Sequence, residues 1–222
     1  MIEAVIFDMD GLMIDSEPFW RESEPVVLNK VGVPMTANDA FETTGLRIDE
    51  VVKYWHRKHP WDLQKHSIAA LSDAIVDEVI DRVYRFGKPL PGLQQVIDIF
   101  RDKHLPLALA SSSPERLIVA ILEKLELRND FPVIHSAEHE AYGKPHPAVF
   151  LYTANLLNVT PEHCLVLEDS LNGVIAAKAA KMRCIAVPEA HFQKDIRFSI
   201  ADMQLPSLEA FNETIWQRLN KG

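Results

Sequence analysis

Two acidic residues near the start of the chain have a spacing that suits phosphoryl transfer. Asp8 and Asp10 follow the short apolar run 4–7, and Gly11 comes next. Residues two apart on a strand point to the same side, so both carboxylates can approach one substrate atom. A carboxylate is anionic at neutral pH and attacks phosphorus without an activating base. The second carboxylate can protonate a leaving alcohol and later deprotonate water, while Gly11 permits an immediate turn.

Further polar residues follow later apolar runs or lie in loops. They are Ser111, Lys144, Glu168 and Asp169. In a parallel sheet the carboxyl ends of the strands share one edge, so these residues are expected to meet Asp8 there. Clustered carboxylates repel one another, whereas Mg²⁺ takes oxygen ligands and also prefers phosphate oxygens. The set therefore predicts a site for a divalent cation and a phosphate, in which the Lys neutralises phosphate oxygens.

Short apolar runs alternate with helical patterns over most of the chain. This alternation predicts parallel strands with right-handed helical crossovers, and hence an α/β fold with a parallel sheet flanked by helices. The expected strands are 4–7, 105–110, 133–135, 164–167 and 184–187, and the expected helices after them are 93–101, 117–125, 148–157, 174–181 and 208–219.

Residues 16–88 show helical periodicity and no convincing strand. We expect a small α-helical bundle, a cap domain, inserted after the first strand; the core domain then comprises 1–15 and 89–222. Ser67 or Ser72 is expected to cap one helix, and Pro25 to kink or split another.

Composition excludes several classes of function. The chain has 222 residues, with 23 Lys plus Arg against 32 Asp plus Glu and a net charge of −9. An acidic chain without a basic block is a poor ligand for nucleic acid or anionic lipid. No apolar stretch reaches membrane-spanning length, and no secretory leader is visible. Cys164 and Cys184 lie in apolar runs and are expected in the core. We expect a cytoplasmic monomer with a small-molecule substrate.

Four motifs, in order, resemble those of the haloacid dehalogenase superfamily. They are 7–11 with Asp15 and Ser16, then Ser111, then 143–147, and then 167–170. The resemblance covers nearly the whole chain, including the inserted cap, and implies a Rossmann-like core. The segments 15–20 and 45–49 resemble most closely the group of 2-deoxyglucose-6-phosphate and hexitol phosphatases.

The resemblance implies a role for each matching residue. Asp8 would be the nucleophile that forms an aspartyl phosphate, and Asp10 the general acid and base. Mg²⁺ would be bound by Asp8, the backbone carbonyl of Asp10 and Asp169, with Glu168 beside it through water. Ser111 and Lys144 would hold the phosphoryl group, assisted by backbone donors of Met9, Asp10 and Ser112. The implied substrates are small sugar or sugar-alcohol phosphates, such as 2-deoxyglucose 6-phosphate, mannitol 1-phosphate and sorbitol 6-phosphate.

Two residues of the expected cap are candidates for substrate contact. Trp20 follows the first motif closely and is expected to face the cleft. Arg47 is either a surface residue of a helix or a substrate-binding residue of the cap.

Other functions are compatible with parts of the pattern. A dehalogenase lacks the second Asp of the pair and needs no metal, which disfavours it here. A receiver-type signalling module places its acidic pair first in the chain and has no helical insert. A β-phosphoglucomutase-like phosphotransferase remains as the alternative. Those mutases carry a His where this chain has Trp20, and an Arg three residues after the Gly equivalent to Gly45, where Arg47 comes two after.

Overall fold

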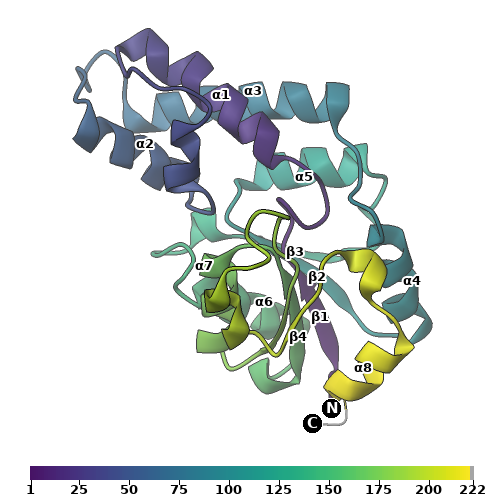
Figure 1. Cartoon of the computed structure of the whole chain (residues 1–222). Helices are drawn as coiled ribbons and strands as arrows, with labels where there is room; N and C mark the ends of the chain where they lie inside the picture. The colour runs from purple at the N-terminus through teal and green to yellow at the C-terminus, as the bar shows by residue number, and fades with distance from the viewer. Residues whose placement is uncertain (221–222) are drawn as a thin grey trace.

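A single parallel sheet forms the centre of the molecule. The computed structural model describes residues 1–220 (Figure 1). The sheet has the strand order β3-β2-β1-β4-β5-β6, so the chain builds outward on one side of β1 and then returns to the other. Ligands of open α/β sheets bind at the carboxyl ends of strands where the order reverses, which here is the end of β1. The strands are β1 (Ala4–Phe7), β2 (Leu107–Ser111), β3 (Val133–Ser136), β4 (Cys164–Glu168), β5 (Arg183–Ala186) and β6 (Met203–Gln204).

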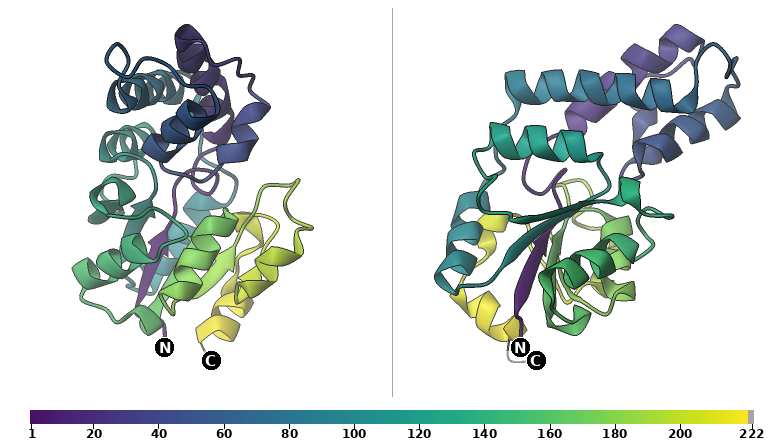
Figure 2. Two further views of the ribbon diagram at one scale, coloured as in Figure 1. Left: turned by 90° about the vertical axis from the view of Figure 1, so that its left-hand side faces the viewer. Right: turned by 180° about the vertical axis from the view of Figure 1, so that it is seen from behind.

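Alternate residues of β1 pack into two different apolar clusters, because successive side chains of a strand point to opposite faces. Val5 and Phe7 pack with residues of α4 (Leu93–Asp102), α5 (Glu115–Lys124) and α8 (Glu213–Asn220). Ala4 and Ile6 pack with residues of α6 (Ala148–Leu157) and α7 (Leu171–Ala179). Figure 2 shows helices on both faces of the sheet. Because both faces of the sheet are buried, the strands appear in the sequence as continuous apolar runs.

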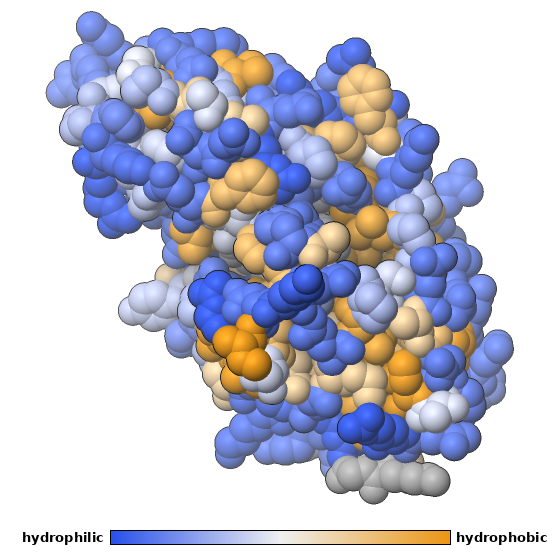
Figure 3. Space-filling view, in the orientation of Figure 1, coloured by the Kyte–Doolittle hydropathy of each residue, from blue (hydrophilic) through white to orange (hydrophobic). Residues whose placement is uncertain are grey.

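The helical insert, residues 16–88, lies beyond the carboxyl ends of the strands, away from the two chain ends (Figure 1). It contains α1 (Glu17–Leu28), α2 (Ile48–Lys58) and α3 (Ile68–Phe86), with short 3₁₀ turns between α1 and α2. α3 contacts both other helices and also α5. Hydrophilic residues cover most of the visible surface of the insert (Figure 3). Ile14 pairs with Pro89, which brings the two connections of the insert side by side. The exact domain boundaries stay a prediction.

The local predictions for the insert have mixed outcomes. Ser67 caps α3, its Oγ accepting a hydrogen bond from the N–H of Ala70 at 3.1 Å. Pro25 lies inside α1, which runs through as one helix, so of the two expected effects, a kink or a split, the split is wrong. Packing of α1 on α3, with Val27 and Leu28 buried, compensates for the backbone donor that Pro25 lacks.

The C-terminal region differs most from the prediction. β6 has only two residues and no apolar run, so the pattern does not reveal it. The expected helix 208–219 is interrupted: residues 208–210 form a 3₁₀ turn, and α8 begins at Glu213. Asn212 explains this start, because its Oδ1 accepts a hydrogen bond from the N–H of Ile215 at 3.1 Å. None of the helices within residues 1–220 has the length and apolar character needed to cross a membrane.

Candidate active site

The ammonium of Lys144 joins two carboxylates at the carboxyl edge of the sheet. Its Nζ lies 2.6 Å from Oδ1 of Asp8 and 2.6 Å from Oε1 of Glu168. Asp8 directly follows β1, Glu168 ends the neighbouring strand β4, and Lys144 comes from the loop before α6. Only 3% of the surface of Lys144 is exposed. The sheet thus assembles residues from three distant motifs into one buried ion-paired group.

Glycines make room for two of the carboxylates. A Cβ at Gly11 would lie 2.2 Å from Oδ2 of Asp169, and one at Gly173 would lie 1.6 Å from Oε1 of Glu168. Gly11 also has a φ of +72°, which an L side chain rarely adopts. Ser170 caps α7, because its Oγ accepts the N–H of Gly173 at 3.0 Å. A larger residue at either glycine would displace the carboxylate beside it.

Burial and mutual repulsion oppose full ionisation of this acidic group. Burial raises the pKa of Asp8 to about 8, an effect that Lys144 opposes and Glu168 strengthens. Burial, together with Glu168 and Asp8, also raises the pKa of Asp169 well above its usual value. Burial opposes the charge on Lys144, yet the two carboxylates beside it raise its pKa. A single ammonium therefore leaves the three buried carboxylates with too little positive charge nearby.

A divalent cation fits this excess of acidic groups. Asp8, Glu168 and Asp169 are buried, and each offers a carboxylate oxygen within 4.8 Å of the other two. Oxygen donors of this kind are the ligands that Mg²⁺ takes in proteins. The donor set therefore matches Mg²⁺ in chemical type, charge and spacing.

Hydroxyl and indole donors surround the carboxylate of Asp10. Its Oδ1 accepts hydrogen bonds from Oγ of Ser16 at 2.6 Å and from Nε1 of Trp20 at 3.1 Å. Its Oδ2 accepts one from Oγ of Ser113 at 2.7 Å, with Oγ of Ser111 at 3.5 Å. Asp10 therefore links the edge of the sheet to the first helix of the insert. Trp20 also lines the cavity that contains Asp8 and Lys144, so it faces the cleft as expected.

The sequence does not single out Ser16 or Ser113 as contacts of Asp10. Ser113 carries a weak signal, because it belongs to a run of three serines at the end of β2. Ser16 precedes α1 and is buried, but a Ser before a helix usually indicates a cap. The Oγ of Ser16 accepts no cap hydrogen bond from the helix and donates to Asp10 instead.

Of the predicted phosphate-binding residues, Asp10, Ser111, Ser112 and Lys144 line the same cavity. Ser111 ends β2, and its Oγ accepts the N–H of Ser113 at 3.0 Å. The Oγ of Ser112 is buried and has no hydrogen-bond partner within residues 1–220. Met9 is buried beside Asp8, and its carbonyl accepts the N–H of Met13 in the turn after β1.

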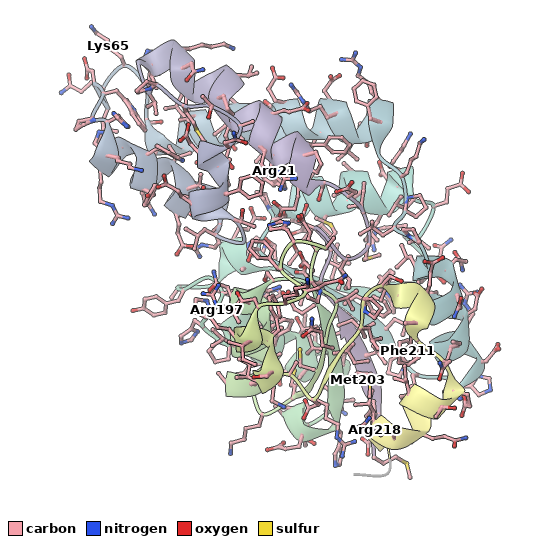
Figure 4. All side chains as sticks on the ribbon, in the orientation of Figure 1. Arg21, Lys65, Arg197, Met203, Phe211 and Arg218 are labelled. Carbon is pink, nitrogen blue, oxygen red and sulfur yellow. The ribbon has the colours of Figure 1, made fainter. Side chains whose placement is uncertain are left out.

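The cavity has two sides, which come from different parts of the chain. Arg21 connects the insert to the core: its Nη1 lies 3.6 Å from Oε2 of Glu17 and 3.7 Å from Oε1 of Glu189, and Figure 4 labels it on α1. The sheet side consists of Asp8, Asp10, 111–113, Lys144 and 168–170; the insert side consists of Glu17, Trp20, Arg21, Glu24, Ala40, 43–46, Ile48 and Val51.

The structure does not bring Arg47 to this cavity. Its Nη1 donates to the carbonyl oxygens of Ala137 at 3.0 Å and Glu140 at 2.7 Å, in the core segment after β3. Its Nε lies 3.2 Å from Oδ1 of Asp49. Arg47 therefore connects the insert to the core beside the cavity. The sequence left two alternatives open, a surface position and a substrate contact, and this arrangement is neither of them.

Comparison with known proteins assigns the family. The model of the haloacid dehalogenase-like hydrolases matches residues 2–181, and the chain belongs to this family. It is 42% identical to hexitol phosphatase B of Escherichia coli over 208 residues, which are 93% of each chain. The chain is an enzyme, a phosphoric monoester hydrolase.

Solved structures share the fold over the full length. CbbY from Rhodobacter sphaeroides in complex with phosphate superposes with a TM-score of 0.84 and 27% identity, covering 95% of this chain and 96% of the other. A β-phosphoglucomutase from Clostridium difficile superposes with a TM-score of 0.85 and 22% identity, covering 100% and 98%. The latter likeness concerns the fold alone.

Proposed function

We propose that this phosphatase hydrolyses monophosphates of small sugars and sugar alcohols, with 2-deoxyglucose 6-phosphate, mannitol 1-phosphate and sorbitol 6-phosphate as candidate substrates. One observation carries the proposal: two carboxylates with different surroundings, Asp8 and Asp10, line one cavity with Lys144. The similarity to hexitol phosphatase B supports the choice of substrate class.

The different surroundings of the two carboxylates suit two roles. Asp8, beside Lys144, attacks phosphorus; a bond forms from its carboxylate oxygen to phosphorus as the bond to the leaving alcohol breaks. Asp10 gives that alcohol a proton. Asp10 then takes a proton from a water molecule, whose oxygen attacks the aspartyl phosphate and releases inorganic phosphate and free Asp8. Ser111 and Lys144 hold the phosphoryl oxygens, with backbone donors of Met9, Asp10 and Ser112.

The acidic residues on the sheet side are proposed to hold Mg²⁺. Asp8 and Asp169 would bind it directly with the backbone carbonyl of Asp10, and Glu168 would lie beside it through water. When bound, the cation neutralises charge on the transferred phosphoryl group.

Phosphate release from the three candidate substrates tests the proposal. Each is assayed with Mg²⁺, after removal of divalent cations with EDTA, and after Mg²⁺ is restored. We expect turnover that EDTA abolishes and Mg²⁺ restores. Equal turnover with and without EDTA would contradict the cation, and no turnover of any sugar or sugar-alcohol phosphate would contradict the substrate class.

Hydrolysis is favoured over phosphate transfer between sugar positions. The mutase alternative needs a second phosphate-binding group on the insert, but Nη1 of Arg47 donates to two core carbonyls, and Arg21 is paired with Glu17 and Glu189. The test incubates β-glucose 1-phosphate with the enzyme, Mg²⁺ and a trace of glucose 1,6-bisphosphate. Glucose 6-phosphate appearing much faster than free phosphate would favour the mutase.

A further inference from the structure

One face of α1 carries two buried carboxyl groups that the proposed chemistry does not use. Glu17, Trp20, Arg21 and Glu24 follow the spacing of a single helix face, and all four line the cavity. Only 8% of Glu17 and 5% of Glu24 are exposed. Burying a carboxyl group is costly unless it is hydrogen-bonded, so these positions require an explanation.

Glu24 and Thr44 have unused hydrogen-bonding capacity. Among residues 1–220, neither Oε2 of Glu24 nor Oγ1 of Thr44 has a hydrogen-bond partner, although both atoms are buried. The two residues line the cavity from different segments: Glu24 from α1, and Thr44 from the loop after the 3₁₀ turn Asp39–Thr43. Buried polar groups in proteins are normally hydrogen-bonded. Two such atoms lining one cavity indicate a ligand that supplies the missing partners.

The position of Glu24 along α1 indicates how far this ligand reaches. Trp20 contacts Asp10, which is proposed to protonate the leaving oxygen. Glu24 lies four residues further along the helix, about 6 Å at the usual rise per residue. A substrate held at Lys144 by its phosphate therefore needs several atoms beyond the leaving oxygen to reach Glu24.

We propose that Glu24 and Thr44 bind the distal hydroxyl groups of an extended polyol monophosphate, and so select it over shorter phosphate esters. This inference rests on the proposed function and specifies its substrate class. A hydroxyl group both donates and accepts hydrogen bonds, so it can satisfy a carboxyl group in either protonation state and the hydroxyl of Thr44. A second phosphate or carboxylate only accepts, and it would lie against Glu24 with Glu17 nearby, while Arg21, the cation on this face, is already paired with Glu17 and Glu189.

A pair of substrates of different length tests the inference. The specificity ratio is kcat/KM for sorbitol 6-phosphate divided by kcat/KM for glycerol 3-phosphate, whose chain is three carbon atoms shorter. Glu24→Met keeps a side chain of similar length but cannot form the hydrogen bond. We expect it to lower the specificity ratio about tenfold, the effect of losing one hydrogen bond of about 1.4 kcal/mol. Thr44→Val is expected to lower it by a smaller factor.

Glu22→Met is the matched control, because Glu22 lies on the same helix, is exposed and pairs with Arg82 outside the cavity. We expect it to keep the specificity ratio of the unmodified enzyme. Circular dichroism checks each variant for folding. If Glu24→Met does not fold, the specificity ratio of Thr44→Val tests the inference.

An unchanged ratio in the folded variants would overturn the inference, as would a preference of the unmodified enzyme for glycerol 3-phosphate. Failure of the unmodified enzyme to hydrolyse any polyol phosphate would instead contradict the proposed function.

Discussion

The two sides of the cavity differ in how far their polar groups are satisfied within the protein. On the sheet side, Lys144 contacts two carboxylates at 2.6 Å, and Asp10 accepts hydrogen bonds from three side chains. On the insert side, Glu24 and Thr44 keep buried atoms without partners within residues 1–220. Groups that perform one fixed reaction benefit from positions set in advance. Groups that recognise a ligand, as proposed for the insert side, need hydrogen-bonding capacity that the protein itself does not use.

Ser112 is informative because it departs from this division. It lies on the sheet side, yet its buried Oγ has no partner in the described part of the chain. Its backbone N–H is also proposed to assist in holding the phosphoryl group. Within the cavity, unused hydrogen-bonding capacity on both sides therefore coincides with residues proposed to bind substrate.

The largest effect is expected at the proposed nucleophile. Asp8→Asn replaces the carboxylate with an amide, which is no nucleophile and is a poorer cation ligand. We expect turnover to fall to the assay background for every substrate, including p-nitrophenyl phosphate, while the Asn side chain can still accept the hydrogen bond of Lys144. Phosphate release measures the loss, and circular dichroism checks the fold. Near-normal turnover would refute the assigned role of Asp8.

Asp10→Asn is expected to affect substrates unequally. Losing general acid catalysis costs on the order of 10² to 10⁴ in rate. We expect that loss in kcat/KM for sugar-alcohol phosphates, whose leaving group needs a proton, and a much smaller one for p-nitrophenyl phosphate. Because the second step also needs Asp10, mass spectrometry of this variant with p-nitrophenyl phosphate should find phosphate on Asp8. Phosphate on another residue would show that the pair is assigned wrongly.

Sequence reasoning was most successful where a residue's position follows from a strand end. Asp8, Ser111 and Glu168 lie where apolar runs stop, and parallel pairing then brings them to one edge. Contacts between the insert and the core follow from no such rule. The contact of Trp20 with Asp10 depends on how α1 leaves the first motif, and the guanidinium of Arg47 lies against core carbonyls that no local pattern specifies.

Glu24 was missed for a related reason. An acidic residue within a helix ordinarily indicates a solvated face, but the face of α1 that carries Glu24 is buried against the cavity and α3. The signal in the sequence is its spacing: Glu24 comes four residues after Trp20 and seven after Glu17, on the same helix face. That spacing becomes informative only once Trp20 is known to contact Asp10.

The burial of Glu24 should make the free energy of unfolding depend on pH. Burial, together with the nearby carboxylate of Glu17, raises the pKa of Glu24 from 4.5 to about 8. Between these values the folded state binds the proton more tightly than the unfolded state, so this group lowers the free energy of unfolding as pH rises, by about 1.4 kcal/mol per pH unit. Glu24→Gln removes this loss. We expect its stability relative to the unmodified protein to increase steadily from pH 5 to pH 8.

Urea unfolding in EDTA at several pH values measures this difference. Thr44→Val is the control, because Thr44 lines the same cavity without a titratable proton, and its effect on stability should be the same at each pH. A difference between Glu24→Gln and the unmodified protein that does not vary with pH would show that Glu24 loses its proton as readily in the folded state as in the unfolded state.

The smallest effect is expected at the contact that joins the two sides. Trp20→Phe keeps an aromatic ring against the cavity but removes the indole N–H that lies 3.1 Å from Oδ1 of Asp10. A hydrogen bond to a charged group contributes about 1.5 to 3 kcal/mol, and Asp10 keeps its bonds to Ser16 and Ser113, so we expect the lower end, about a tenfold loss. If Trp20 acts by positioning Asp10, kcat/KM should fall for sugar-alcohol phosphates and much less for p-nitrophenyl phosphate, which needs no proton on its leaving group. Trp20→His restores a ring N–H and should recover part of the loss. An equal loss for both kinds of substrate, with no recovery in Trp20→His, would mean that Trp20 only shapes the cavity.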